Sequence, residues 1–265
     1  MNSPDPKFLA TAIEAVVRAG EMQRAHVGSD LHVEKKGSID LVTEVDLAVE
    51  RMFREMIANR FPDHSVLAEE MGEIGAASTY RWVFDPLDGT TNYAHGIPIY
   101  CATLALEIEG VPTVGAVFDP NRNELFTAER GVGAWLNGRP LHVSSTSSLD
   151  DAVLVTGFPY DIRERLKEAL GLFGAFLSHA RAVRRLGSAA IDLCWVAAGR
   201  MDGFWEQGLQ VWDTMAGAIV VEEAGGRVSS LDGTPWKPHD GQILASNSHV
   251  HDQMVGVIRD YMLQH

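Results

Sequence analysis

Two aspartates lie three positions apart around a proline in FDPLDGTTNYAHG, the segment of residues 84–96. Asp-Pro and Asp-Gly pairs are common in turns, because Asp bonds its own downstream backbone, Pro fixes φ and Gly tolerates positive φ. A plain turn is therefore one interpretation of this segment. Residues 81–84 nevertheless predict a short buried strand, which places Asp85 where a strand leaves its sheet. There Asp85, Asp88 and the main-chain carbonyl of Leu87 could bind a hard cation.

Gly89, Thr90 and Thr91 follow the two aspartates directly. If a helix begins there, their backbone amides can face an anion, because the first amides of a helix have no partner within it. The sequence thus offers ligands for a cation and for an anion within one short segment.

Three further acidic residues stand at positions that could hold an ion or cap a helix. Glu69 follows a predicted short strand at residues 65–67. Asp213 opens an apolar helix, and Asp46 lies three residues after Thr43 at the spacing of a capping box. Capping is the better interpretation of the last two in isolation. Together with the 85/88 pair, however, these residues form a set of oxygen ligands without a His/Cys cluster, which suits Mg²⁺ and not zinc.

The composition limits the classes of function. The 265 residues include 22 basic and 36 acidic side chains, which gives a net charge of −14. Such a charge disfavours electrostatic capture of nucleic acid or of an anionic membrane surface. An acidic chain that handles an anionic substrate needs cations at its site, which again favours a metal. Hydrophobic residues make up 46% of the chain, and this content argues against disorder.

The cysteines and the apolar runs predict a cytoplasmic protein. Cys101 and Cys194 both lie in apolar runs and are expected to be buried thiols in a reducing compartment. No apolar span approaches the roughly 20 residues of a membrane helix, and the N-terminus lacks the regions of a signal peptide.

The hydrophobic pattern predicts a layered α/β sandwich. Residues 7–27 and 44–59 show helical spacing, and strand-like periods run from 82 to about 143 as an antiparallel meander. After residue 150 strands alternate with helices, the helices being expected at 162–178, 188–199, 213–224 and the C-terminal end. The change near the middle divides the chain into an N-terminal half, 1–145, with most of the acidic candidates, and a C-terminal half, 146–265, with Asp213.

Several of these motifs together carry a family resemblance. Asp85-Pro-Leu-Asp88-Gly-Thr-Thr resembles the signature of the inositol monophosphatase family, and Trp212-Asp213-Thr-Met-Ala-Gly, followed by Glu223-Ala-Gly-Gly, resembles its second signature. Further matches in the same order are Lys36-Gly-Ser-Ile-Asp-Leu-Val-Thr with Asp46, Ala68-Glu69-Glu70 and Gly187-Ser-Ala-Ala-Ile-Asp. The resemblance covers nearly the whole chain. It implies an αβαβα sandwich with an antiparallel N-terminal sheet and a mixed C-terminal sheet, a homodimer, and a lithium-sensitive Mg²⁺-dependent phosphatase, a phosphoric monoester hydrolase.

The resemblance also implies a set of metal ligands and a proton relay. Glu69, Asp85 and the Leu87 carbonyl would hold the first Mg²⁺, Asp85, Asp88 and Asp213 the second, and Glu69 would help to bind a weak third ion. The hydroxyl of Thr90 would lie between a reacting water and Asp46. The rival account from the residues alone is that Thr43 and Asp46 form a capping box and that Thr90 begins a helix.

Substrate contacts follow from the same resemblance. The amides of Gly89 and Thr90 would face the phosphate, and Ala189 and Glu206 match positions that contact a polyol. Lys36 falls in a mobile loop of the family, although a solvated lysine is an equal alternative. Two Mg²⁺ ions roughly 3.5–4 Å apart would neutralise a phosphate monoester, lower the pKa of a bound water and stabilise the leaving alkoxide.

The choice of substrate is left between alternatives. Thr90-Thr91-Asn92-Tyr93 resembles the inositol phosphatase form of the motif, which favours inositol-1-phosphate. Some relatives accept fructose-1,6-bisphosphate, glycerol-2-phosphate or nucleotide monophosphates, so a broad sugar phosphatase is the alternative. Residues 158–161 resemble prokaryotic members and not the animal enzymes. A second hypothesis is a regulatory protein associated with RNA or transcription, supported by the basic cluster at 181–185, which could also be a solvated strand face, a subunit contact or a phosphate contact.

Overall fold

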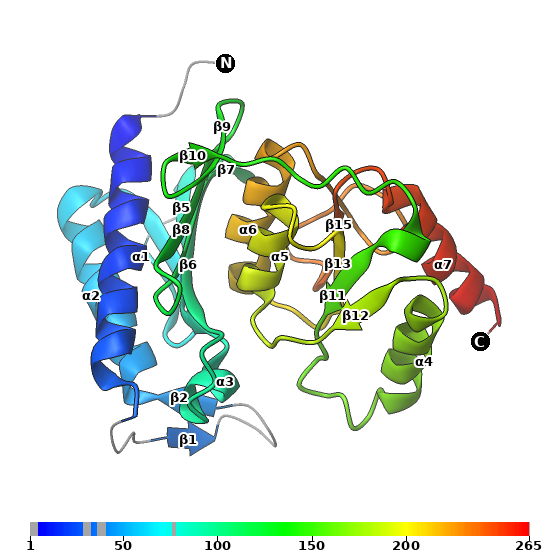
Figure 1. The fold of residues 1–265 in the computed structure, drawn as a ribbon. Helices are drawn as coiled ribbons and strands as arrows, with labels where there is room; N and C mark the ends of the chain where they lie inside the picture. The colour runs from blue at the N-terminus through cyan, green and yellow to red at the C-terminus, as the bar shows by residue number, and fades with distance from the viewer. Residues whose placement is uncertain (1–4, 29–32, 36–40, 76–77, 265) are drawn as a thin grey trace.

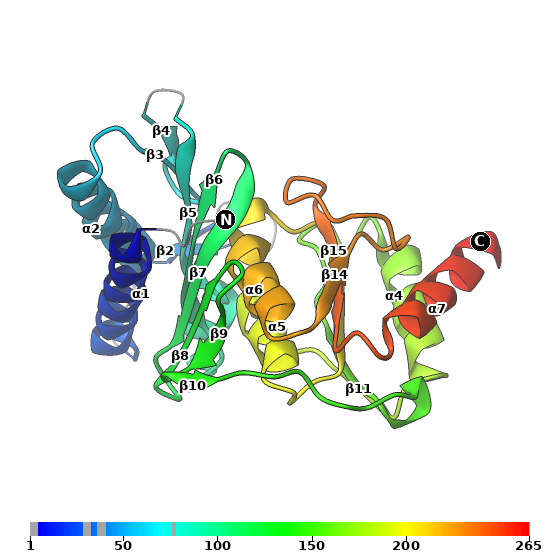
Figure 2. The ribbon, with the colours of Figure 1, turned by 90° about the horizontal axis from the view of Figure 1, so that it is seen from above.

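The computed structural model describes residues 5–28, 33–35, 41–75 and 78–264, and it arranges them in five layers (Figures 1 and 2). Helices α1 and α2 cover one face of a large sheet, α5 and α6 lie between this sheet and a smaller one, and α4 and α7 cover the far side of the smaller sheet. The predicted αβαβα sandwich is confirmed. The α-helices are α1 Pro6–His26, α2 Glu44–Arg60, α3 Thr90–Ala94, α4 Leu166–Leu177, α5 Ala189–Ala197, α6 Val211–Glu223 and α7 His251–Gln264.

The large sheet has the order β10-β9-β8-β7-β6-β5-β3-β4. It is antiparallel except that β3 pairs in parallel with β5, a feature that the meander pattern did not predict. A separate hairpin of β1 and β2 precedes α2. The strands up to this point are β1 Val33–Lys35, β2 Leu41–Thr43, β3 Ser65–Ala68, β4 Gly72–Ile74, β5 Tyr80–Asp88, β6 Cys101–Ile108, β7 Val111–Asp119, β8 Glu124–Glu129, β9 Gly133–Leu136 and β10 Arg139–Pro140.

The smaller sheet is mixed, as expected. Its order is β12-β11-β13-β15-β14, with parallel pairs around β11 and antiparallel pairs around β15. Side chains alternate between its two faces, so Phe204 packs towards the large sheet while Trp205 stacks on Phe176 of α4. Its strands are β11 Val153–Thr156, β12 Ala182–Arg184, β13 Gly203–Gln207, β14 Arg227–Ser229 and β15 Gln242–Ser246.

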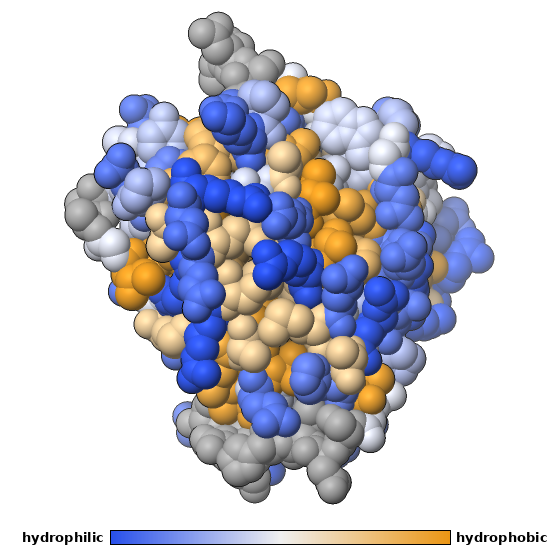
Figure 3. Space-filling view, turned by 90° about the vertical axis from the view of Figure 1, so that its left-hand side faces the viewer, coloured by the Kyte–Doolittle hydropathy of each residue, from blue (hydrophilic) through white to orange (hydrophobic). Residues whose placement is uncertain are grey.

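Capping residues fix where the two N-terminal helices begin. Asp5 caps α1 by accepting a hydrogen bond from the backbone of Lys7, and α2 begins with the predicted capping box of Thr43 and Asp46. Figure 3 shows the side of the molecule on which both helices lie, with hydrophilic and hydrophobic side chains mixed over it. Arg60 of α2 forms a 2.7 Å ion pair with Glu14 of α1. None of the helices in the described ranges combines the length and the apolarity needed to cross a bilayer.

Three apolar cores hold the layers together. One lies between α1, α2 and the large sheet, one surrounds α5 and α6 between the two sheets, and one lies under α4 and α7. Helices α5 and α6 contact strands of both sheets, so the central core joins the two halves of the chain.

Candidate active site

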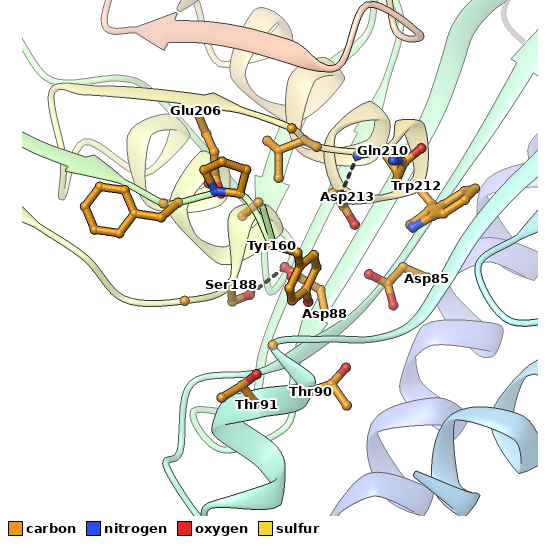
Figure 4. Close-up of a pocket in the computed structure, with 18 of the residues that line it drawn as sticks. Asp85, Asp88, Thr90, Thr91, Tyr160, Ser188, Glu206, Gln210, Trp212 and Asp213 are labelled. Atoms are coloured by element: carbon orange, nitrogen blue, oxygen red, sulfur yellow. Dashed lines mark hydrogen bonds between the residues drawn. The ribbon is translucent and has the colours of Figure 1, made fainter. Parts of the chain in front are cut away.

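The cavity that gathers the predicted residues has a volume of about 700 Å³ and lies where the ends of β5, α5, α6 and β13 meet (Figure 4). Its lining brings together nine of the residues singled out in the sequence: Glu69, Asp85, Leu87, Asp88, Gly89, Thr90, Ala189, Glu206 and Asp213. Asp46 is buried and is not among the lining residues. Lys36 lies outside the described residues. The predicted mobile loop is therefore not tested.

Asp85 and Asp88 are held by an irregular stretch of β5. The strand continues to Asp88, so the expectation that Asp85 lies where the strand leaves the sheet was wrong: Asp85 lies inside β5, at a break in its register with β6. Oδ1 of Asp85 accepts a 2.8 Å hydrogen bond from the backbone nitrogen of Leu87. The Leu87 carbonyl accepts a 2.9 Å hydrogen bond from the Thr90 hydroxyl. A β-bulge of this kind redirects side chains, and here it turns both carboxylates towards the cavity.

The start of α5 binds Asp88 from the other half of the chain. Oδ2 of Asp88 accepts hydrogen bonds from the Ser188 hydroxyl at 2.6 Å and from the backbone nitrogen of Ala190 at 2.8 Å. Ser188 is also the N-cap of α5. The sequence matched this segment to the family but did not predict that Ser188 contacts Asp88. A serine directly before an apolar helical run is an N-cap signal, but it does not reveal a partner that far away in the chain.

Asp213 comes from the first turn of α6. The helix begins at Val211 rather than at 213, so Asp213 is its third residue and not the predicted N-cap. Its Oδ2 accepts a 2.7 Å hydrogen bond from the backbone nitrogen of Gln210, which closes a capping box. Asp213 therefore both caps the helix and lines the cavity.

Burial and mutual repulsion raise the pKa of these carboxyl groups. Desolvation is the largest cause for Asp85, whose pKa lies well above its usual value, and the charges of Glu69, Asp88 and Asp213 raise it further. Burial also raises the pKa of Asp88 to about 6, against the lowering effect of the Ser188 hydrogen bond. The pKa of Asp213 is raised by burial and then by Asp88. Glu69, Asp85, Asp88 and Asp213 thus bring negative charge together in one cavity, an arrangement that a bound cation would stabilise.

The donor set fits Mg²⁺ in its chemistry. All candidate ligands are carboxylate or carbonyl oxygens, which hard divalent cations prefer. Within the described ranges, no three His, Cys, Asp or Glu side chains are already arranged as an ion cage. Asp85, Asp88 and Asp213 thus share a cavity in which neighbouring carboxylates help to raise their pKa values, and the described residues form no preformed cage.

Asp46 and Thr90 have separate hydrogen-bond partners. Oδ2 of Asp46 accepts from the Thr43 backbone nitrogen at 2.9 Å and from its hydroxyl at 2.5 Å, as the capping-box account expected. Thr90, the first residue of α3, donates its hydroxyl proton to Leu87 and not to Asp46. Oδ1 of Asp46 is buried and has no hydrogen-bond partner among the residues that the structure describes. Burial, with a smaller effect of the Glu69 charge, raises the pKa of Asp46 to about 6.

Glu206 lies at the other end of the cavity, close to Gly157 and Arg185. It belongs to β13 and is 8% exposed, and a Cβ on Gly157 would overlap its carboxylate. Burial raises the pKa of Glu206 to about 8, while the charge of Arg185 opposes this rise. Arg185 also lines the cavity. Among the interpretations left open for the basic cluster at 181–185, a phosphate contact therefore fits the position of this residue.

Comparisons of the sequence and of the structure with known proteins indicate the same family. The model of the "inositol monophosphatase family" matches residues 5–263. An inositol-1-monophosphatase of Synechocystis is 46% identical over 93% of this chain and 87% of its own length. The Nus factor SuhB of Escherichia coli is 42% identical over 96% of both chains. A solved structure of an inositol monophosphatase from Anabaena superposes with a TM-score of 0.88 at 43% identity, covering 96% of each chain.

Proposed function

Because this chain belongs to the inositol monophosphatase family and is a phosphomonoester hydrolase, we propose that it uses Mg²⁺ to hydrolyse inositol-1-phosphate to inositol and phosphate. The observation that supports this proposal is the shared cavity, which has four carboxyl groups and the Leu87 carbonyl at one end and Glu206 at the other. An anionic phosphate needs cations at the first end, and a polyol needs hydrogen-bond acceptors at the second.

We assign the ions to the carboxylates as the family resemblance implies. Glu69, Asp85 and the Leu87 carbonyl would bind the first Mg²⁺, Asp85, Asp88 and Asp213 the second, and Glu69 would take part in a weak third site. When bound, the ions would supply charge neutralisation of the phosphate and activation of the attacking water. The Leu87 carbonyl now accepts the Thr90 hydroxyl, so binding at this oxygen would compete with that hydrogen bond or share the second lone pair.

The remaining residues would orient the substrate and move a proton. Gly89, the N-cap of α3, has a φ of 95°, and a Cβ there would lie 2.9 Å from the Ile99 carbonyl oxygen, so this position requires glycine. Its amide and that of Thr90 would face the phosphate, and Ala189 and Glu206 would contact the polyol. For the relay, the Thr90 hydroxyl would have to turn from Leu87 towards the unpartnered Oδ1 of Asp46.

The direct test is phosphate release from inositol-1-phosphate. Activity should require Mg²⁺, disappear in EDTA and fall when Ca²⁺ or Li⁺ competes for the oxygen ligands, because these ions have the wrong geometry or charge. Undiminished turnover in EDTA would contradict the proposal.

A second candidate substrate is a sugar phosphate with another anionic group, such as fructose-1,6-bisphosphate. Arg185 favours it, because it is the one Lys, Arg or His among the described cavity-lining residues and forms no hydrogen bond or ion pair within the described part of the chain. A guanidinium binds phosphate through two parallel hydrogen bonds. Arg185→Gln should then lower kcat/KM for the bisphosphate about tenfold or more and leave inositol-1-phosphate within about twofold. The control is Arg184→Gln, whose guanidinium donates to the Val183 carbonyl and does not line the cavity. An equal loss for both substrates would mean that Arg185 acts only on Glu206.

A regulatory role could coexist with hydrolysis, because one relative carries the name Nus factor SuhB. The acidic charge of −14 argues against direct binding of RNA, and Arg181 of the basic cluster is already paired with Asp151. We further propose that the protein is a cytoplasmic homodimer whose chain divides into halves 1–145 and 146–265. Light scattering in solution would test the dimer, and a pull-down of transcription proteins with wild type and Arg184→Ala would test the regulatory role.

A further inference from the structure

A buried glutamine of α1 reaches the strand that carries Asp85 and Asp88. Gln23 is completely buried, and its Nε2 donates hydrogen bonds to the Pro86 carbonyl at 2.7 Å and to the Cys101 carbonyl at 3.3 Å. Both neighbours are acceptors, so the NH₂ group and not the oxygen of the amide must face them. The first bond ends on the residue directly after Asp85, and the second on the strand residue paired with Asp88.

The two carbonyls lie where the ladder between β5 and β6 is interrupted. Asp85 pairs with Thr103 and Asp88 pairs with Cys101, and the register shifts between them. Backbone groups at such a break lose their strand partners, and an unpaired buried carbonyl is costly. The side-chain amide of Gln23 bridges the two strands at this break and binds a carbonyl of each.

Other contacts fix Gln23 itself. The Tyr93 hydroxyl of α3 donates a 2.7 Å hydrogen bond to the Gln23 main-chain carbonyl. One turn earlier, a Cβ on Gly20 would overlap the Phe118 ring, so α1 approaches the sheet closely there. Oε1 of Gln23 is buried, and no group in the described part of the chain hydrogen-bonds to it. An apolar side chain would avoid that cost, which indicates that the two donated bonds matter.

We infer that Gln23 is a positioning residue: it holds the 85–88 bulge in the shape that presents Asp85, the Leu87 carbonyl and Asp88 to the cavity. Gln23 is not among the residues that line the cavity, and it acts through the Pro86 carbonyl. The inference rests on the proposed Mg²⁺ site for its consequence in catalysis, but its structural part can be tested without metal.

The test uses Gln23→Met, which keeps the length of the side chain and removes both donors. In EDTA, hydrogen exchange of peptides covering 84–90 and 99–103 should become about 3- to 10-fold faster than in wild type. The Mg²⁺ concentration for half-maximal activity should rise by a similar factor, with kcat at saturating Mg²⁺ within about threefold. Val16→Ala is the control, since Val16 is equally buried on α1 and has no side-chain group that could hydrogen-bond to the bulge.

The outcomes separate the two proposals. Unchanged exchange at 84–90, or the same change in the Val16→Ala control, would overturn the positioning role of Gln23. Faster exchange in a protein whose wild type shows no Mg²⁺-dependent hydrolysis would support the positioning role and overturn the proposed function. If Gln23→Met does not fold, Tyr93→Phe removes only the hydrogen bond that anchors Gln23, and it should change exchange at the same peptides in the same direction.

Discussion

Oδ2 of Asp213 lies 2.7 Å from the backbone nitrogen of Gln210, which donates a hydrogen bond to it. The same carboxyl group lines the cavity opposite Asp85 and Asp88 (Figure 4). One side chain therefore serves the start of α6 and, in our proposal, a metal ion. The two roles make different demands, because a cap needs only an oxygen acceptor and an ion needs a charge.

Asp213→Asn should separate these roles. The amide oxygen of Asn can still accept from Gln210, so the melting temperature should change by no more than a few degrees. The lost charge should lower turnover by two or more orders of magnitude at saturating Mg²⁺. Steady-state kinetics and a thermal melt on the same preparation check both. Near-normal turnover would leave Asp213 as a cap alone.

Asp119→Asn is the matched control for that substitution. Asp119 is also a buried acceptor, with hydrogen bonds from the Asn121 and Arg122 backbones and an ion pair to Arg122, but it does not line the cavity. We expect this change to cost stability and to leave kcat unchanged.

Asp85→Asn should make the metal-free protein more stable. The folded pKa of Asp85 is raised by burial and by Glu69, so at pH 7.5, above its unfolded pKa, its ionisation destabilises the folded state. Asn removes this charge and can keep the hydrogen bond from Leu87. In EDTA the variant should melt several degrees above wild type, where about 1 kcal/mol corresponds to about 2–4 °C. Added Mg²⁺ should stabilise wild type and not the variant. A lower melting temperature in EDTA would contradict the repulsion argument.

Thr90→Ala and Asp46→Asn test the proton relay. If the two residues act as one unit, each change should lower kcat at least tenfold with little effect on Mg²⁺ affinity, and the double variant should be little worse than either single one. If Thr90 only binds the Leu87 carbonyl and Asp46 only caps α2, the losses should appear in stability, at roughly 0.5–2 kcal/mol each, and should add. The measurement is a double-mutant cycle of kcat and of unfolding free energy.

His251 should make stability depend on pH. The Ser229 hydroxyl donates to the Ser230 carbonyl, so the ring Nε2–H donates to Ser229 and Nδ1 accepts from Ser246. Burial lowers the folded pKa of His251 to about 4, below the usual 6.5. The contribution of neutral His251 to the unfolding free energy is complete above pH 6.5. As the pH falls towards 4, the protein loses about 3 kcal/mol of this free energy at most. His251→Asn should flatten this part of the unfolding free energy profile measured in urea. Equal slopes for variant and wild type would contradict the assignment.

The helices and the set of acidic residues were within reach of the sequence, because amphipathic periods and carboxylates beside apolar runs are local signals. The spacing of apolar residues placed α1 and α2 within one residue at either end. It misplaced the start of α6, because Val211 and Trp212 belong to its first turn, and it did not predict that β3 lies parallel to β5. Pairing of distant strands depends on tertiary contacts that no local pattern encodes.

The supporting contacts of the site were beyond the sequence for the same reason. Ser188 looks like an ordinary N-cap, and Gln23 looks like one polar residue in an amphipathic helix. Each acquires its role only when a strand far along the chain lies against it: Ser188 is 100 positions from Asp88, and Gln23 is 63 from Pro86. Arg185 stayed ambiguous because the sequence cannot tell that the segment directly after β12 borders a cavity.

The hydrogen bond between Ser188 and Asp88 also bears on the order of folding. It spans 100 positions and joins the two halves, so the cavity can take its final shape only after both sheets have formed and docked through α5 and α6. Contacts of such long sequence separation are slow to form, because closure of the intervening chain must precede them. During refolding from urea, helical circular dichroism should therefore recover before hydrolytic activity. A nascent chain that ends before residue 188 would hold most of the acidic side chains and lack the working site.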